Sequence, residues 1–244
     1  MSELYNPKIH ELAEAYMECE FDTSYNPTFT DISFAQAMKI ADAFETGNNY
    51  SPSALLAYDL FISELMAQWQ YVIKSGLNVE PYLETTGEPY KNSGELFADV
   101  KDNNHMFFYL TSNGFGSASN EDHPLLKKSG VILAGIELVY NDIFRIVHDY
   151  FGHCIYGFQF GLKGETNAWQ SHLAMFHSRA ARRALTNETQ GQTSWFQAGR
   201  HLRRTDGTLP RKGEDDFIPL QNRPFAEQRV QVLPTRLFDD LAQF

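Results

Sequence analysis

Five residues in one short part of the chain have the side chains that most often bind divalent metals. Half of the eight histidines of the protein lie in this region. His148, Asp149 and His153 occur in the segment NDIFRIVHDYFGH, and Glu165 and His172 follow in GETNAWQSHLAMFH. Neutral imidazole and carboxylate groups are ligands for iron, manganese and zinc. The composition of the region therefore predicts a metal centre.

Helix geometry indicates which of these side chains can meet. Asp149 and His153 are four residues apart and share one helix face. Glu165 and His172 are seven residues apart, and about 20° separates them around a helix. Two helices that each direct a carboxylate and an imidazole inward are a known way to build a metal site in a helical protein. All four residues are therefore expected to contribute to the centre, as ligands or as groups that orient ligands, and Asp149 is also assigned a catalytic role.

His148 and His153 are five residues apart, which is about 140° around an ideal helix. They converge only if the helix is broken between them, and Gly152 is placed where such a break is favoured. His148, His153 and Glu165 would then form a set of two histidines and one carboxylate, with His172 as a further ligand. That set suits non-haem Fe(II), with Mn or Zn as alternatives, and one or two metal ions.

A sixth candidate precedes this region. Glu64 lies in a predicted helix over 54–75, with Gln68 one turn later. If this helix packs on the metal centre, Glu64 is another ligand or a general base. The alternative interpretation is a solvated helix face. A buried polar cluster without metal is the corresponding alternative for the whole histidine-rich group.

An arginine-rich window at 179–204 follows the metal-binding region, and Glu188 is its only acidic residue. Arginine makes bidentate contacts with phosphate and carboxylate groups. The window is therefore a candidate surface for a nucleotide, a nucleic-acid strand or another anion, and internal ion pairing is the alternative. The residues assigned to substrate binding are Arg182, Arg183, Glu188, Trp195 and Arg200.

The elements that must position these residues are mainly helical. Apolar spacing predicts helices over 7–19, 34–45, 54–75, 142–152, 164–176, 178–186 and 192–203. Asp31 or Ser33 is expected to cap the second helix and Asn141 the fourth. Residues 77–104 show turn signals, and the segment 106–110 is predicted to be a strand, closed by Asn113, Gly114 and Gly116. The pattern predicts one bundle-like, mainly α domain over 1–244 with a small β element, and a metal-site core at about 141–176.

Composition limits the class of protein. The chain has 244 residues, is 43% hydrophobic and carries a net charge of −11, so it can fold around a core and repels polyanions over most of its surface. It has no apolar run long enough to span a membrane and no apolar leader at its N-terminus. With two cysteines, a disulfide framework is excluded. These features predict a cytoplasmic protein, in the host cytoplasm if viral, without membrane contact, and they do not indicate an oligomeric state.

The segment HDYFGH resembles the H-E-x-x-G-H iron motif of aromatic amino-acid hydroxylases. In that family the two histidines and a downstream glutamate hold Fe(II). Asp149 stands here where the family has glutamate, and the nearest downstream glutamate is much closer than in the family. The match covers six residues, so it implies similar chemistry at His148 and His153 and not a common origin.

A longer pattern resembles an uncharacterised family found in tailed bacteriophages and mobile elements. It comprises FRIVHDYFGH, FGLKGETNAWQSHLAMF, TNETQGQTSWF and FAEQRVQVLP, and it spans roughly 55–235. The resemblance implies a viral source and places the predicted metal ligands, Glu188 and Trp195 within the family's motifs. It implies no particular reaction.

The leading prediction is a metal-dependent enzyme, most concretely a non-haem iron oxygenase or hydroxylase. Its substrate would be a small anionic molecule, such as a nucleotide or a DNA base. A metal-dependent phosphohydrolase of the HD type is the alternative enzyme. It would use His123, the pair His148–Asp149, and one of Asp206, Asp215 or Asp216. A structural or injected phage protein is the non-enzymatic alternative.

Overall fold

The structure, a computed structural model, describes residues 4–84, 87–114, 122–239 and 241. The chain is mainly α-helical and carries two small sheets, which confirms the predicted fold class at that level. Within the described ranges, no helix combines the length and the apolar character needed to cross a bilayer.

Three helices form the N-terminal part, each starting at a side chain that accepts a backbone N–H. These capping residues are Asn6, Ser33 and Ser51, so Ser33 caps the second helix and not Asp31. Proline at the first position of the first and third helices costs no hydrogen bond there. The helices are α1 (Pro7–Phe21), α2 (Phe34–Thr46) and α3 (Pro52–Lys74).

In the second half of the chain, the described residues form four α-helices and two π-helices. The predicted single helix over 142–152 is instead α5 followed by a π-helix. Asn141 does not cap it: the Asp142 carboxylate accepts the N–H of Val139, and Asn141 donates to Oγ1 of Thr111. The elements are α5 (Tyr140–Val147), the first π-helix (His148–His153), α6 (Leu162–Leu173), α7 (Arg179–Thr186), the second π-helix (Asn187–Gly191) and α8 (Gln192–Ala198).

The two sheets are each formed by two strands. β1 (Asn78–Tyr82) pairs in parallel with β2 (His105–Tyr109), which confirms the predicted strand, and β3 (Lys128–Leu133) forms an antiparallel hairpin with β4 (Ile136–Val139). Residues 77–104, read from the sequence as mixed with turns, hold β1 and α4 (Ser93–Ala98). Gly116, one of the residues predicted to end the strand over 106–110, lies outside the described residues.

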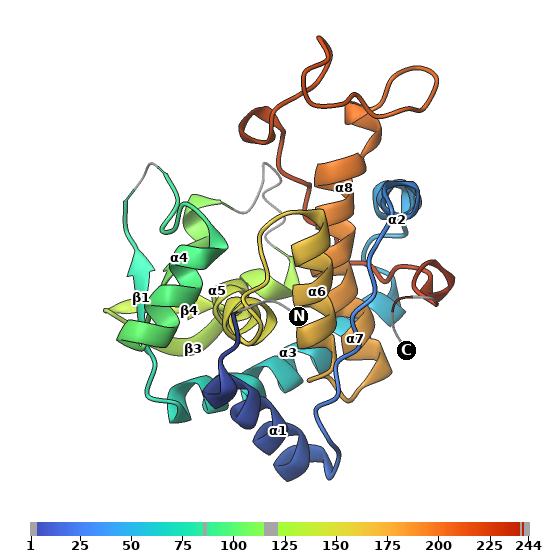
Figure 1. Cartoon of the computed structure of the whole chain (residues 1–244). Coiled ribbons are helices and arrows are strands. Elements are labelled where there is room, and N and C mark those ends of the chain that lie inside the picture. The colour runs from blue at the N-terminus through green and yellow to red at the C-terminus, as the bar shows by residue number, and fades with distance from the viewer. Residues whose placement is uncertain (1–3, 85–86, 115–121, 240, 242–244) are drawn as a thin grey trace.

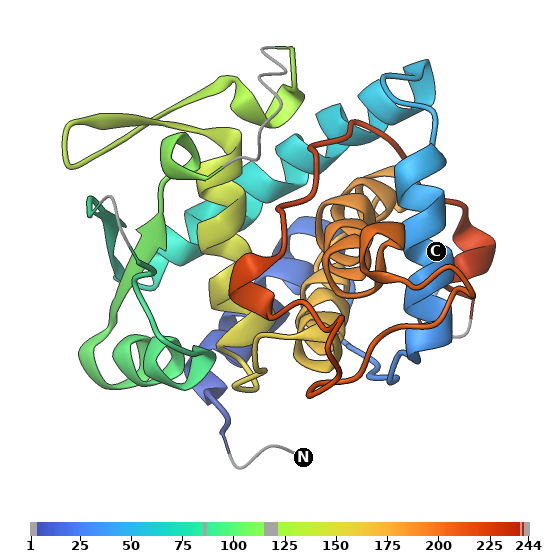
Figure 2. The same cartoon turned by 90° about the horizontal axis from the view of Figure 1, so that it is seen from above.

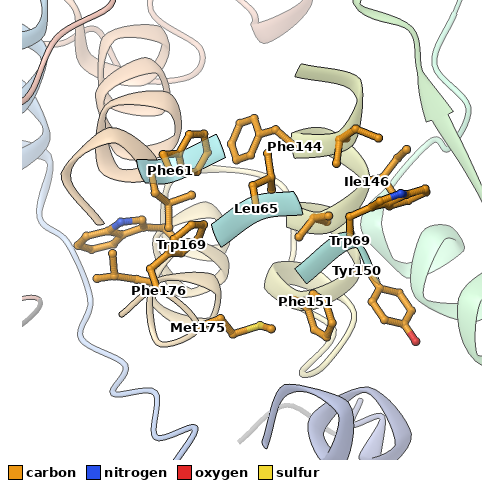
Figure 3. Packing of buried hydrophobic residues seen from close by; sticks show 14 of the residues in the cluster. Phe61, Leu65, Trp69, Phe144, Ile146, Tyr150, Phe151, Trp169, Met175 and Phe176 are labelled. Atoms are coloured by element: carbon orange, nitrogen blue, oxygen red, sulfur yellow. The ribbon is translucent and has the colours of Figure 1, made fainter. Parts of the chain in front are cut away.

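The core is built around α3, which packs against α5 and α7. Figure 3 shows Phe61, Leu65 and Trp69 in succession along α3, with Trp169 on one side of Phe61 and Phe144 on the other. All five side chains are buried. Burial of each such side chain contributes about 1.5–3 kcal/mol, so this packing fixes the relative positions of α5 and α6.

The strands lie on one side of the molecule and α2 on the opposite side (Figures 1 and 2). Between them, α6 packs against the first π-helix, while α7 packs against α3 and α8 against α2. The two segments that carry the candidate metal ligands are therefore direct neighbours inside the helical part of the fold.

Candidate metal centre

His148, His153 and Glu165 meet in the interior, where α6 packs on the first π-helix. Each offers one ligand atom, and the three atoms lie within 4.8 Å of one another. Hydrogen bonds in a π-helix join residues five apart, so His148 and His153 are about one turn apart and point the same way. The expected convergence is present, but it comes from a wider helix and not from a break at Gly152.

Gly152 has a different role, because it allows α6 to approach. A Cβ atom there would lie 3.0 Å from the carbonyl oxygen of Ala168 and 3.2 Å from the His148 ring. Both separations are tighter than ordinary contacts, so a side chain would push α6 or His148 away. The glycine thus keeps Glu165, on α6, close to the two imidazoles.

The distances in this group suit a metal ion. Oε2 of Glu165 lies 3.5 Å from Nε2 of His153 and 4.0 Å from Nε2 of His148. Two ligands of one ion, each bonded at about 2.0–2.2 Å, have separations in this range. The histidines are 8% and 2% exposed, whereas the Glu165 side chain is 24% exposed. Access to the centre is therefore from the side of Glu165.

Hydrogen bonds to the far side of each imidazole orient the ring and determine which nitrogen faces Glu165. Nδ1 of His153 lies 2.9 Å from the carbonyl oxygen of Phe158 and donates to it, so Nε2 is the nitrogen available to a metal ion. Ligating histidines in metalloproteins commonly have such a partner, which fixes both the tautomer and the ring orientation.

His148 has its partner in a longer chain of buried polar groups. With the lone pair on Nε2, its Nδ1–H donates across 3.2 Å to Nδ1 of His172. Nε2–H of His172 then donates across 2.8 Å to Oε1 of Gln68, whose Nε2 donates across 3.1 Å to the carbonyl oxygen of Met175. Both nitrogens of His172 are occupied, so it is placed to orient His148, and it lies outside the group of three side chains that could hold a metal ion.

Burial would lower the pKa of His153, but without a metal ion Glu165 raises it to about 9, so metal binding displaces a proton from this imidazole. Burial alone would raise the pKa of Glu165, but His153 and His148 lower it to about 2, so the carboxylate is ionised. Burial, followed by the two other histidines, holds the pKa of His172 well below its usual value. A neutral His172 is the form that the hydrogen-bond chain through Gln68 requires.

Two cavities adjoin the centre. The larger, of about 510 Å³, is lined by Glu165 and Arg145. The smaller, of about 260 Å³, is lined by Arg145 and Asp149. Burial raises the pKa of Asp149, and the two neighbouring histidines counteract this only in part. Asp149 thus lies in a cavity next to the ligands, consistent with the catalytic role predicted for it.

Glu64 does not join the centre. Its Oε1 accepts the N–H of Ser178 at 2.9 Å and its Oε2 accepts the N–H of His177 at 2.6 Å. The carboxylate therefore satisfies backbone donors at the start of α7. Glu64 is therefore neither a member of the metal-binding group nor part of a solvated helix face. Its carboxylate instead links α3 to α7.

Glu188 lies in a second buried cluster, away from the ligand trio. Tyr58 donates to its Oε1, Gln192 donates to its Oε2 at 2.8 Å, and Nε2 of His123 is 3.9 Å from Oε1. Burial raises the pKa of Glu188 to about 7 and lowers the pKa of His123 to about 4. Glu188 was predicted to bind substrate, but it does not line the larger cavity. Its hydrogen-bond partner Gln192 lines that cavity instead.

The arginines of the window 179–204 are largely engaged within the protein. Nε of Arg182 donates to the carbonyl oxygen of Phe176, and Nη2 of Arg183 donates to that of Leu233. Arg200 pairs with Asp42 at 3.0 Å. None of the three lines the cavity beside Glu165. Their placement favours internal pairing, the alternative to an anion-binding surface.

The remaining predicted residues also lie outside the centre. Trp195 packs against His201, with 4.0 Å between ring centroids, and does not line the cavity beside Glu165. Asp206 accepts from Thr208, and Asp216 pairs with Arg204. None of the residues 206–216 joins His148 in the metal-binding group found among the described residues. The geometry required by the HD-type alternative is therefore not formed.

Two residues of this region were not singled out from the sequence. Gln68 was noted only as a neighbour of Glu64, and Arg145 only as part of a motif. Gln68 is fully buried on the apolar face of α3, between Leu65 and Val72. An amide on an apolar helix face is costly to bury without partners, and this was the signal for a functional position.

No family model, no curated protein and no solved structure matches this chain.

Proposed function

We propose that this protein is a metal-dependent enzyme whose metal is held by His148, His153 and Glu165. The observation that carries the proposal is the convergence of these three side chains beside two cavities. Two imidazoles and one carboxylate leave coordination positions open, and this set is typical of non-haem Fe(II) oxygenases. We assign Fe(II) as the metal and an oxidation or hydroxylation of a small molecule as the reaction.

The residues around the candidate metal centre would have different roles in this reaction. Bound Fe(II) would supply the activation of O₂. His172 and Gln68 hold His148 in the orientation and tautomer that a ligand needs. The packing around His148 and His153 excludes water from the far side of the centre. Asp149 is the group placed to hold or move a proton at the smaller cavity.

Metal content tests the proposal directly. The metal-free protein is titrated with Fe(II) without oxygen, and with Mn(II) and Zn(II), and the bound metal is measured by mass spectrometry. We expect one or two ions per chain and a higher melting temperature, because an ion that binds the folded state stabilises it. A protein that binds none of these metals would contradict every metal-dependent function.

Two variants locate the site. His153→Ala is expected to abolish metal binding, while His177→Ala, at an exposed histidine, retains it. Oxygen uptake by the Fe(II)-loaded protein then separates an oxygenase from a hydrolase, which would instead release phosphate from nucleotides. Asp149→Asn is expected to retain the metal and lower the turnover. Unchanged metal content in His153→Ala would remove His153 from the site.

A further inference from the structure

The larger cavity beside Glu165 has room for a small organic molecule. Its volume of about 510 Å³ lies within the range of ligand pockets. It shares Arg145 and Phe160 with the smaller cavity that reaches Asp149. A molecule in this space would lie next to the exposed side of the metal centre, so the lining indicates which class of molecule fits.

Apolar side chains dominate the mouth of this cavity. Phe160, Leu220 and Phe225 line it and are 47%, 52% and 74% exposed, respectively. Tyr109 and Phe196 add two further rings to the lining. Large apolar side chains gathered in the open around a cavity mark a surface that a ligand covers. Rings of this kind favour a planar, aromatic ligand.

The charges of the lining do not favour a phosphate. Its charged members among the described residues are Glu88, Arg145 and Glu165. Nη1 of Arg145 donates to the carbonyl oxygen of Tyr109 at 2.8 Å, and its Nη2 donates to that of Gly114. One N–H of each terminal nitrogen of the guanidinium is therefore engaged by the backbone. Two carboxylates and one engaged arginine suit an uncharged ligand better than an anion.

One side chain of the lining has a fixed hydrogen-bonding direction. Nε2 of Gln192 donates to Oε2 of Glu188 at 2.8 Å and to Oε1 of Gln228 at 3.0 Å. Both N–H groups of Gln192 are thereby engaged in the orientation of the amide that the structure shows. The carbonyl oxygen Oε1 is the polar group of Gln192 that is left to accept a hydrogen bond from a ligand.

We infer that the cavity binds a planar, uncharged aromatic molecule that donates an N–H or O–H to Oε1 of Gln192. In this assignment the buried Glu188 contributes to specificity, because it accepts from Nε2 of Gln192 and so leaves Oε1 of Gln192 to face the ligand. The inference deepens the proposed function by naming its substrate class. It also departs from the anionic substrate expected from the arginine-rich window.

Three related probes test this assignment on the metal-free protein by ligand-observed NMR titration. Indole has an N–H donor, 1-methylindole lacks it, and indoxyl phosphate adds a dianion. We expect indole to bind about fivefold to tenfold more tightly than 1-methylindole, the effect of one hydrogen bond. Indoxyl phosphate is expected to bind no more tightly than indole.

Two variants on α8 assign the discrimination to one side chain. Gln192→Leu is expected to bring the ratio between the two indoles close to one. Gln197→Leu is the matched control: Gln197 lines the same cavity, but its Oε1 already accepts from Arg223 at 3.1 Å, so the ratio should remain. Circular dichroism and the melting temperature establish that each variant folds.

Equal affinity of the native protein for both indoles, no binding of either, or tighter binding of indoxyl phosphate would each overturn the assignment. A ratio that persists in Gln192→Leu would overturn the role of this residue. The metal titration is a separate measurement on the same protein. Failure of the metal proposal and failure of the ligand class can therefore be distinguished.

Discussion

Among the described residues, two buried clusters bring a histidine close to a glutamate, and the two glutamates have opposite charge states. At the candidate metal centre, two imidazoles lower the pKa of Glu165 to about 2. In the second cluster, a hydroxyl and amides surround Glu188, and burial raises its pKa to about 7. The closest nitrogen–oxygen distances, 3.5 and 3.9 Å, are similar. A buried histidine near a glutamate is therefore not in itself a metal site.

Three further differences separate the clusters. The metal centre has a second imidazole, its histidines have partners that fix the metal-facing nitrogen, and its carboxylate lines a cavity. In the second cluster, Nδ1 of His123 accepts the N–H of Leu125, and Glu188 is 4% exposed. The first cluster is arranged to receive an ion from outside, whereas the second is closed by the protein's own groups.

The largest expected effect compares the two glutamates directly. Glu165→Gln removes a charged ligand and should weaken metal binding by more than the 10–100-fold typical of changes around a ligand. Glu188→Gln should leave metal affinity unchanged. Isothermal titration with Mn(II) measures both. Equal losses in the two variants would remove the distinction between the clusters.

The second-largest expected effect is a pH dependence of protein stability that comes from Glu188. The folded pKa of Glu188, about 7, is above its ordinary value of 4.5, so the folded state binds more protons between these values. Its contribution is full below about pH 4.5 and is lost as the pH rises towards 7. The loss is about 3 kcal/mol of unfolding free energy.

Urea unfolding at pH 5 and pH 8 measures this effect. Glu188→Gln keeps an acceptor for Tyr58 and cannot ionise, so its unfolding free energy should fall by less over this interval than that of the native protein. An identical pH profile in both proteins would show that Glu188 is ionised in the folded state.

A smaller effect is expected from the hydrogen-bond chain behind His148. Gln68→Leu leaves Nε2–H of His172 without its acceptor and should weaken metal binding roughly tenfold. Gln70→Leu, at an exposed position on the same helix, is the control. If the two variants bind metal equally well, His172 does not orient His148 through Gln68.

The smallest effect is expected at the surface of the arginine-rich window. Arg200→Ala removes an exposed ion pair with Asp42, and Arg203 remains bound to the same carboxylate. The melting temperature should change little, with no change in affinity for the indole probes. A marked loss of ligand affinity would restore the window as a binding surface.

Much of the helical framework could be predicted from the sequence, because apolar spacing and capping residues are local signals. The sequence also indicates His148, His153 and Glu165, since their types are those of metal ligands. It did not indicate α4, because Asn92-Ser93-Gly94 reads as a turn, although Asn92 caps that helix. Local signals of this kind do not distinguish a turn from a helix start.

The parts of the site that were missed depend on distant partners. Gln68 reaches His172 from 104 positions earlier, and Tyr58 reaches Glu188 from 130 positions earlier. No spacing rule relates such pairs. The role of Gly152 was also misjudged, because its value lies in the approach of Ala168 and not in its own backbone angles.

The first π-helix holds one residue more between its two histidines than a regular helix would need to bring them together. A π-helix is wider than an α-helix because its hydrogen bonds span one residue more. Deleting one residue between His148 and His153 would let a regular α-helix continue from α5. The two histidines would then be four residues apart and would still share one helix face. The convergence of the pair therefore depends on the match between its spacing and the type of helix, and a change of both together would preserve it.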